Sequence, residues 1–324
     1  FMYCNPKDIL LSLTERTNKV LTNPKINALS FETGPMAISG STRMQACNTL
    51  MLALGCALLE KKPINKLTDD FIALYKKVTP FNFLIPFVEC ESDIYESNNF
   101  VQYSTNNFGL TVLTDTTERS PTFSLNPFEN TYDKNSTFSW CHLTILDCEN
   151  SKSAWEKILS RSPRSLEWEQ SRLQTGKNRL LGFDFSNTGF QSRVSSLGKQ
   201  KVSEFSILKI DSTIKFKLKD CFTEIRTETL SSFFEQLLLK MILNIHSTLV
   251  MGRLERFQGN VMTWVKPSNY KLVERAIRYT QQLLKQNNQE PPPFEVLAQA
   301  FFKQMTQIKH NESIVLKTFN QLKK

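Results

Sequence analysis

The sequence has few of the residues that build metal centres and disulfide frameworks. Only three histidines occur in 324 residues, and none is paired with another at a metal-ligand spacing. The seven cysteines are scattered without Cys-x-x-Cys spacing, so we expect reduced core thiols and neither disulfides nor metal ligands. We therefore expect no metal and no cofactor, and we interpret His142 and His246 as packing or hydrogen-bonding residues.

Long apolar runs and dense basic blocks are absent as well. The longest apolar run, Leu50 to Leu59, is well short of the roughly 20 residues that span a membrane, and the start of the chain does not resemble a signal peptide. The net charge of +9 is spread along the chain without a basic block or an aromatic-interleaved RNA motif. These absences predict a cytoplasmic protein that binds neither membrane nor nucleic acid, with a basic field that attracts anionic metabolites.

One segment near the amino end has the chemistry of a phosphate seat. Small, hydroxyl and cationic residues precede a long apolar run in the order Gly34-Pro35-Met36-Ala37-Ile38-Ser39-Gly40-Ser41-Thr42-Arg43-Met44. Ser39 or Ser41 can act as a helix N-cap, which leaves backbone amides and the positive end of the helix dipole facing an anion. Arg43 adds a forked donor. The alternative is an ordinary capped helix, from about Thr42 to Glu60, that binds no ligand.

This segment carries a family resemblance. Gly40-Ser41-Thr42-Arg43-Met44, with Gly34-Pro35 ahead of it, resembles the motif shared by the N-acetylmuramic acid 6-phosphate etherases and the glucokinase regulatory protein, a branch of the sugar isomerase (SIS) domain superfamily. Later stretches resemble the end of the second SIS domain in that branch, namely Lys240-Met241-Ile242-Leu243-Asn244-Ile245-His246-Ser247-Thr248, Met251-Gly252-Arg253-Leu254, Asn260-Val261-Met262, Ser268-Asn269-Tyr270-Lys271-Leu272 and Arg275-Ala276. The chain departs from the motif at Gln45-Ala46-Cys47, which removes the usual lysine near the anion.

The order of expected elements predicts an α/β fold. Strands are expected at Phe100–Ser104, Phe138–Ile145 and Arg179–Phe185, and helices at Ser153–Leu159 and Phe190–Leu197. This alternation favours a parallel sheet covered on both faces. The resemblance implies the three-layer α/β/α SIS architecture, which is flavodoxin-like.

The carboxy-terminal half adds a lysine-rich strand and a set of helices. Ile214 to Lys219 alternates apolar residues with lysines, which predicts a half-buried strand at a sheet edge. Three helices are expected at the end, at Tyr270–Gln286, Phe294–Ile308 and Ser313–Leu322. We interpret them as a helical cap.

The chain is expected to contain three units. Residues 1–65 resemble the C-terminal part of a first SIS domain, because the sequence opens on a strand-like run, Phe1 to Cys4. Residues 66–265 resemble a second SIS domain with a degenerate phosphate loop, in which Ser104 and Thr105 keep the hydroxyl chemistry. Residues 266–324 form the cap or lid.

Two further stretches are candidates for the same site. Thr114 to Thr122 is dense in hydroxyls and charges and can line a cleft between the domains; the alternative is a capped turn with a solvated Glu118–Arg119 pair. The longest helix, expected from Thr229 to Leu254, carries a polar row that includes Lys240. A lysine among apolar residues is costly unless its ammonium reaches water or an anion, so we predict that Lys240 reaches the sugar phosphate. The alternative is a row that faces solvent.

The resemblance implies a phosphosugar-binding, non-catalytic regulatory protein. A hexose phosphate such as fructose 6-phosphate would bridge Ser41, Thr42 and Arg43 of the first unit and Lys240 of the second, and a sugar kinase is the further partner that the resemblance implies. The alternative is an enzyme, an N-acetylmuramic acid 6-phosphate etherase-like lyase or a sugar-phosphate isomerase, which needs a carboxylate base with a raised pKa.

No residue is assigned as catalytic. Glu32 and Glu118 are acidic residues near the motifs, but their spacing places neither beside Arg43. The resemblance implies that the acidic catalytic residues of an etherase would lie upstream of the residues that match here.

Overall fold

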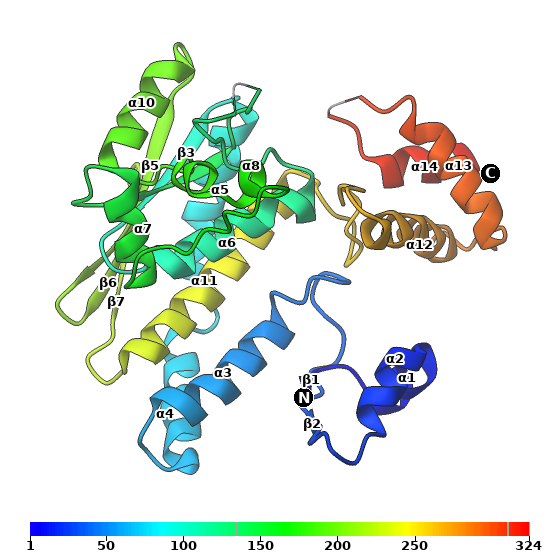
Figure 1. The fold of residues 1–324 in the computed structure, drawn as a ribbon, viewed down its shortest axis with the longest axis horizontal. Coiled ribbons are helices and arrows are strands. Elements are labelled where there is room, and N and C mark those ends of the chain that lie inside the picture. The colour runs from blue at the N-terminus through cyan, green and yellow to red at the C-terminus, as the bar shows by residue number, and fades with distance from the viewer. Residues whose placement is uncertain (134, 310, 324) are drawn as a thin grey trace.

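The computed structural model describes residues 1–133, 135–309 and 311–323 and shows an α/β protein (Figure 1), which confirms the predicted fold class. Its main sheet has the spatial order β4-β3-β5-β6-β7. The strands are β3 (Phe100–Thr105), β4 (Cys141–Ile145), β5 (Val202–Ile210), β6 (Thr213–Leu218) and β7 (Cys221–Arg226). Strands β3, β4 and β5 are parallel, whereas β6 and β7 continue the sheet as an antiparallel hairpin.

Helices cover and extend this sheet. In chain order they are α1 (Lys7–Leu13), α2 (Glu15–Leu21), α3 (Gln45–Leu59), α4 (Ile64–Val78), the 3-10 turn η1 (Asn82–Leu84), α5 (Ile85–Glu96), α6 (Gly109–Phe123), α7 (Ser151–Leu159), α8 (Arg172–Thr175), α9 (Lys177–Leu181), α10 (Asn187–Leu197), α11 (Ser232–Arg253), α12 (Tyr270–Gln286), α13 (Phe294–Met305) and α14 (Ile314–Leu322). A short parallel pair, β1 (Met2–Tyr3) with β2 (Leu29–Ser30), lies beside α3 (Figure 1). None of the helices in the described ranges has the length and apolar character needed to cross a bilayer.

The two faces of the main sheet differ in burial. One face is apolar and lies against α5, α6 and α11; there Phe87 of α5 stacks on Phe205 with ring centroids 5.5 Å apart, and Tyr103 is fully buried. The opposite face is covered near β4 by α10, while Glu204 and Lys217 remain exposed. The continuous helical layer is therefore on one side of the sheet, and that side carries the polar network described below.

Two sequence-based strand predictions are wrong. The stretch Arg179–Phe185 is helical at its start, as α9, because its apolar run is too short for periodicity to separate a helix from a buried strand. The lysine-rich strand β6 lies inside the sheet, since β7 pairs along its outer side. The turn between them is two residues long and places Lys219 at a positive φ of 50°, a position where Gly or Asn is usual, so the hairpin has no clear sequence signal.

The structure contains the long helix and the three carboxy-terminal helices that the sequence predicted. Helix α11 runs through the middle of the molecule, with α5 and α6 on one side and α3 on the other (Figure 1). Helices α12, α13 and α14 share a separate apolar core. That core also contains Ile38 and Met44, so the Gly34–Met44 segment is packed into the carboxy-terminal helical unit.

Helices α3 and α11 approach closely at a glycine. A Cβ atom placed on Gly55 would lie 2.0 Å from Cζ of Phe233, which is shorter than any real contact. Phe233 packs in the small core shared by α3, α4 and α11. The glycine therefore sets how near the two helices come.

We expect Gly55→Ala to destabilise the protein by about 1–3 kcal/mol, because the added methyl overpacks the contact with Phe233. A glycine-to-alanine change inside a helix otherwise raises stability by up to about 1 kcal/mol. Urea unfolding followed by circular dichroism measures the difference. Gly252→Ala in α11 is the matched control, since its Cβ would approach Phe257 only to 3.0 Å. An unchanged or raised midpoint for Gly55→Ala would contradict the role of this glycine.

Candidate functional site

The Gly34–Met44 segment is held between α11, α12 and the start of α3. The Ser39 amide donates to the Asn260 carbonyl at 2.7 Å, and the Tyr279 hydroxyl of α12 donates to the Ser39 carbonyl. Gly40 has φ +77°, and a Cβ there would lie 2.6 Å from Oη of Tyr279. Only glycine combines this backbone conformation with so close an approach.

The start of α3 lacks the predicted cap. The helix begins at Gln45, three residues later than expected, and its N-cap is Met44, whose side chain makes no capping bond; neither Ser39 nor Ser41 acts as the cap. The first backbone bond at this end runs from the Cys47 amide to the Thr42 carbonyl, 2.9 Å. Among the described residues, the amides of residues 42–46 donate to no protein acceptor. Free amides at a helix start attract an anion.

The direction of two of these amides follows from peptide geometry. A trans peptide points its N–H opposite to the preceding carbonyl. The Arg43 carbonyl accepts from Nζ of Lys240 at 2.6 Å, so the Met44 amide points away from Lys240. The Ser39 carbonyl accepts from Tyr279, so the Gly40 amide points away from that hydroxyl. Both amides are thus oriented by side chains from other helices.

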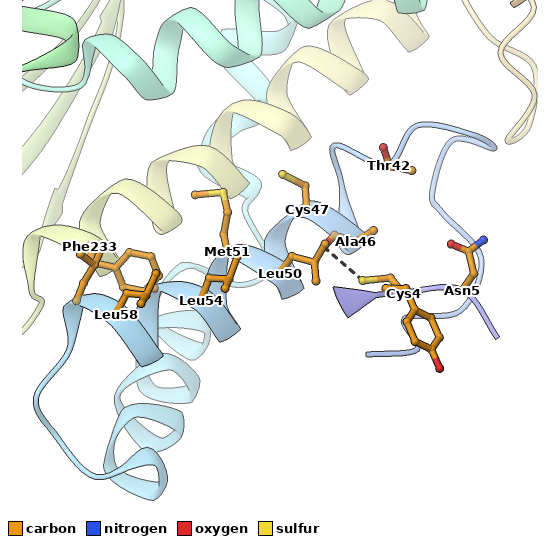
Figure 2. A pocket seen from close by; sticks show the side chains of 13 residues that line it. Cys4, Asn5, Thr42, Ala46, Cys47, Leu50, Met51, Leu54, Leu58 and Phe233 are labelled. Atoms are coloured by element: carbon orange, nitrogen blue, oxygen red, sulfur yellow. Dashed lines mark hydrogen bonds between the residues drawn. The ribbon is translucent and has the colours of Figure 1, made fainter. Parts of the chain in front are cut away.

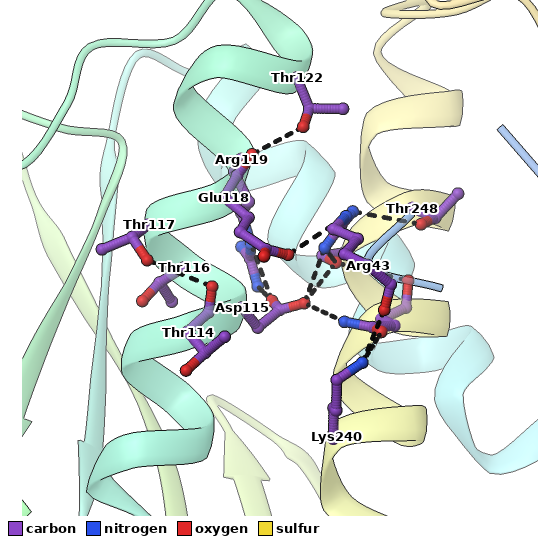
Figure 3. Close-up of polar contacts among 12 residues, drawn as sticks. Arg43, Thr114, Asp115, Thr116, Thr117, Glu118, Arg119, Thr122, Lys240 and Thr248 are labelled. Atoms are coloured by element: carbon purple, nitrogen blue, oxygen red, sulfur yellow. Dashed lines mark hydrogen bonds and ion pairs between the residues drawn. The ribbon is translucent and has the colours of Figure 1, made fainter. Parts of the chain in front are cut away.

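Arg43 is 5% exposed, and its guanidinium points inward to α6 and α11 (Figure 3). Nη1 lies 3.0 Å from Oδ1 of Asp115 and 3.3 Å from Oγ of Ser247. Nη2 lies 3.5 Å from Oγ1 of Thr248, whereas Nε has no hydrogen-bond acceptor and lies 4.0 Å from a carboxylate oxygen of Glu118. The guanidinium is therefore engaged mainly with protein groups.

Lys240 meets Arg43 as predicted from the sequence, but its ammonium is also engaged with protein groups. Nζ donates to the Arg43 carbonyl at 2.6 Å, to Oδ1 of Asn48 at 2.8 Å and to Oδ1 of Asn244 at 2.9 Å. These three bonds use all three donors of an ammonium. Burial lowers the pKa of Lys240, and the nearby Glu118 and Asp115 charges oppose that shift. The polar row on α11 therefore faces the interior, and the alternative of a solvent-facing row is wrong.

A second layer of buried charge lies behind Arg43 (Figure 3). Asp115 accepts from Nη2 of Arg119 at 2.9 Å and from the Asn244 amide at 2.9 Å. Nη1 of Arg119 reaches Glu91 at 2.8 Å, and Glu91 also accepts from Nε2 of His246 at 3.0 Å. The network thus alternates guanidiniums and carboxylates from the segment before α3, from α6 and from α5, and it ends at His246 of α11.

Within this network the pKa values of Asp115 and His246 are both lowered. Burial alone would raise the pKa of Asp115, but the charges of Arg119 and Arg43 hold it below its ordinary value. Burial lowers the pKa of His246, against the opposing charge of Glu91, so its imidazole is neutral at pH 7. Asp115 is thus the carboxylate that balances two buried guanidiniums.

The stretch Thr114–Thr122 is part of helix α6, so the alternative of a capped turn is wrong. Arg119 is fully buried in it, so the alternative of a solvated Glu118–Arg119 pair is wrong as well. Glu118 remains partly exposed, with 41% of its side chain accessible. Burial raises the pKa of Glu118, although Arg43 opposes the shift.

Ser104 and Thr105 lie at the carboxyl end of β3 with other partners. The Ser104 hydroxyl donates to Glu204 of the neighbouring strand. The Thr105 hydroxyl accepts from the Phe108 amide at 3.1 Å, just before α6. These two hydroxyls share no hydrogen-bond partner with Arg43 or Lys240, so the structure does not join them to the Gly34–Met44 segment.

Ser41 and Thr42 differ in exposure. Ser41 is buried, with its amide bonded to the Ile38 carbonyl at 2.9 Å. Thr42 is exposed and lines one end of an apolar groove along α3, beside Asn5 (Figure 2). The groove has a volume of about 710 Å³, and its floor is formed by residues such as Leu50 and Leu54.

The sequence alone did not identify Arg275 as a cation beside Gly40. If Gly40 carried a Cβ, that atom would lie 3.0 Å from Cζ and 3.1 Å from Nε of Arg275, on α12. Arg275 is partly exposed, and within the described ranges it has neither a hydrogen-bond acceptor nor a carboxylate at ion-pair distance. Arg275 entered the sequence analysis only as part of the resemblance, because no residue pattern indicates that α12 lies beside residue 40.

Comparison with known protein families finds no match for this chain. Comparison with curated proteins finds no match either.

We expect Asp115→Asn to lower the free energy of unfolding by about 3–5 kcal/mol, because it leaves two buried guanidiniums without their shared carboxylate. Chemical denaturation at pH 7 measures the loss. Asp147→Asn is the control, since that carboxylate is 87% exposed and its change should have little effect. A loss below about 1 kcal/mol, the scale of an exposed pair, would contradict the bridging role of Asp115.

The difference in stability between the parent and Asp115→Asn should depend on pH. Because the folded-state pKa of Asp115 is lowered, the stability that its charge contributes is present above its unfolded pKa of about 3.9. That contribution is lost as the pH falls through the lower folded value. The stability gap between the parent and Asp115→Asn should therefore be constant from pH 7 to 5 and shrink below about pH 4. A gap that instead widens in acid would show that the sign of the shift is wrong.

Proposed function

We propose that this chain binds a phosphorylated sugar without transforming it, as a regulatory protein of the SIS type similar to the glucokinase regulatory protein. The phosphate would bind at residues 40–46. The observation that carries the proposal is an uncapped helix start whose amides have no acceptor among the described residues, near the guanidinium of Arg275, which has no partner among them either. Both features favour a doubly charged anion.

The residues predicted from the sequence take different parts in this proposal. Ser41 and Thr42 contribute at the turn itself, Thr42 with an exposed hydroxyl. Arg43 contributes its backbone amide, while its guanidinium anchors the turn to Asp115. Lys240 fixes the Arg43 carbonyl. Arg43 and Lys240 are thus positioning residues, and Arg275 is the cation available to the ligand.

The finer predictions belong to the same proposal. We infer a three-layer SIS-type domain in which α10, lying against β4, begins the second helical layer. A cytoplasmic location remains a proposal from the sequence pattern, and a sugar kinase as protein partner follows only from the resemblance. Ser104 and Thr105 have no part in the phosphate contact, because their bonds lie within the sheet and the start of α6.

Binding titrations with fructose 6-phosphate and N-acetylmuramic acid 6-phosphate test the proposal. We expect Arg275→Gln to weaken binding about tenfold or more, since hydrogen bonds to charged groups contribute about 1.5–3 kcal/mol. Arg278→Gln is the matched control on the same helix, because Arg278 is exposed and already paired with Glu274 at 2.7 Å. Equal affinity of the parent and Arg275→Gln for both sugars would refute the phosphate site.

An enzymatic function is the second candidate, and Glu118 is the observation in its favour. Its pKa is raised by burial, its side chain is partly exposed, and it lies 4.0 Å from Nε of Arg43. A carboxyl group of this kind suits proton abstraction beside a carbonyl or ether. Glu32 does not share this setting, because its carboxylate accepts from the Lys7 amide at the start of α1.

Product analysis separates the two candidates. On the binding proposal, the parent releases neither lactate from N-acetylmuramic acid 6-phosphate nor an isomerised sugar from fructose 6-phosphate. Release of either product by the parent, together with its loss in Glu118→Gln, would replace the binding proposal with the enzymatic one. Glu149→Gln, on an exposed residue away from Arg43, is the control.

A further inference from the structure

A polar cavity lies on the face of the main sheet that is opposite to α5, α6 and α11. It is enclosed by β4, α10 and the chain before β4, and its volume is about 350 Å³, within the range of small-molecule sites. Its polar wall includes Glu129, His142, Asp184, Ser192 and Arg193. His142 follows Cys141 along β4 and so points away from the face that carries the Arg43 network.

His142 presents a bare acceptor to this cavity. Its Nδ1 lies 3.1 Å from the Leu143 carbonyl and 3.4 Å from the Gln102 side-chain amide. A carbonyl can only accept, so Nδ1 carries the proton. Burial, opposed by Glu129, lowers the pKa of His142 to about 4, so the ring is neutral at pH 7 and Nε2 holds a lone pair.

No described residue donates to that lone pair. The nearest charged atom is Oε1 of Glu129, 4.0 Å from Nε2, and it is also an acceptor. Nε2 of His142 and Oε1 of Glu129 therefore face each other without a donor between them; Oε1 already accepts from Arg193, and His142 is only 4% exposed. The Nε2 lone pair opens on the cavity, so it favours a molecule that brings N–H or O–H donors.

The charges around the cavity favour a cation. Arg193 pairs with Glu129 and donates to the Ser139 carbonyl at 2.6 Å, so its charge is already balanced. Asp184 accepts from the Ser186 amide at 3.0 Å through Oδ1, and within the described ranges Oδ2 has no partner. The Asp184 charge also acts on His142 and opposes the lowering of its pKa.

Asp133 and Asp184 are the other two carboxylates in the cavity lining. Asp133 at the cavity rim pairs with Arg179 at 3.5 Å. Asp184 is therefore the carboxylate left without a cation among the described residues that line the cavity. Helix α10 admits this carboxylate because residue 189 is glycine; a Cβ there would lie 2.7 Å from Cγ of Asp184. The described residues include no group of three His, Cys, Asp or Glu that could hold a metal ion.

We propose that this cavity binds a small hydrophilic amine, with its ammonium group between Nε2 of His142, Glu129 and Asp184. The hydroxyl of Ser192, which makes no hydrogen bond within the described ranges, is available to a hydroxyl of the ligand. A carboxylate or phosphate ligand is disfavoured, because Arg193, the guanidinium in the described part of the wall, is already paired. The site is separate from the proposed phosphosugar site and does not depend on it.

A matched pair of probes tests this site. Serinol (2-amino-1,3-propanediol) and glycerol share one skeleton and differ by an ammonium in place of a hydroxyl. At pH 7 we expect serinol to bind at least about tenfold more tightly than glycerol in calorimetric titrations of the parent, since a charged hydrogen bond contributes about 1.5–3 kcal/mol. Serinol should also shift the His142 imidazole resonances and leave those of His246 unchanged.

Variants of one carboxylate locate the binding. Asp184→Asn keeps the shape of the side chain and should weaken serinol binding about tenfold, whereas Asp147→Asn, outside the cavity, should not change it. The comparison of serinol with glycerol uses only the parent protein, so it tests the proposed amine site even if Asp184→Asn fails to fold. Equal binding of serinol and glycerol, no serinol binding at millimolar concentration, or an unshifted His142 resonance would each overturn the proposal.

Discussion

The buried carboxylate of Asp115 is the group on which the centre of this protein depends. It lies on α6, and its partners come from the amino-terminal segment through Arg43, from its own helix through Arg119, and from α11 through Asn244 and Ser247. A charge removed from water must be balanced by opposite charge and hydrogen bonds, and this requirement fixes all the partners at once. Segments about 70 and 130 residues apart in sequence are thereby held at one point.

The same constraint ties the Gly34–Met44 segment to the rest of the protein. Its arginine points inward to Asp115, its Ser39 carbonyl accepts from Tyr279, and its apolar residues Ile38 and Met44 enter the carboxy-terminal core. The charged and apolar groups of the segment are used for packing, so the backbone amides are what remain for a ligand.

Sequence reasoning reached the α/β class, the central helix, the three carboxy-terminal helices and the proximity of Arg43 and Lys240. The sequence pattern indicated that Arg43 and Lys240 lie near each other. It could not indicate which groups their side chains contact, because those contacts depend on the residues packed opposite to them. Asp115 and Asn48 could not be recognised as the partners of these two cations, because neither lies in a pattern that marks a buried ion pair. The β6–β7 hairpin was missed because Lys219 occupies a turn position normally filled by Gly or Asn. Arg275 and the unpaired nitrogen of His142 become visible only when distant elements are placed together.

The entry of Ile38 and Met44 into the core of α12, α13 and α14 also bears on how the chain folds. Ribosomal synthesis releases these two residues more than two hundred positions before the helices that enclose them. Until residues 261–319 have been made, that core has no counterpart for them, and their apolar side chains stay in contact with water or with temporary partners. Closing such a long loop is slow, so the last helical unit is expected to dock late, with chaperones protecting the early segment in the interval.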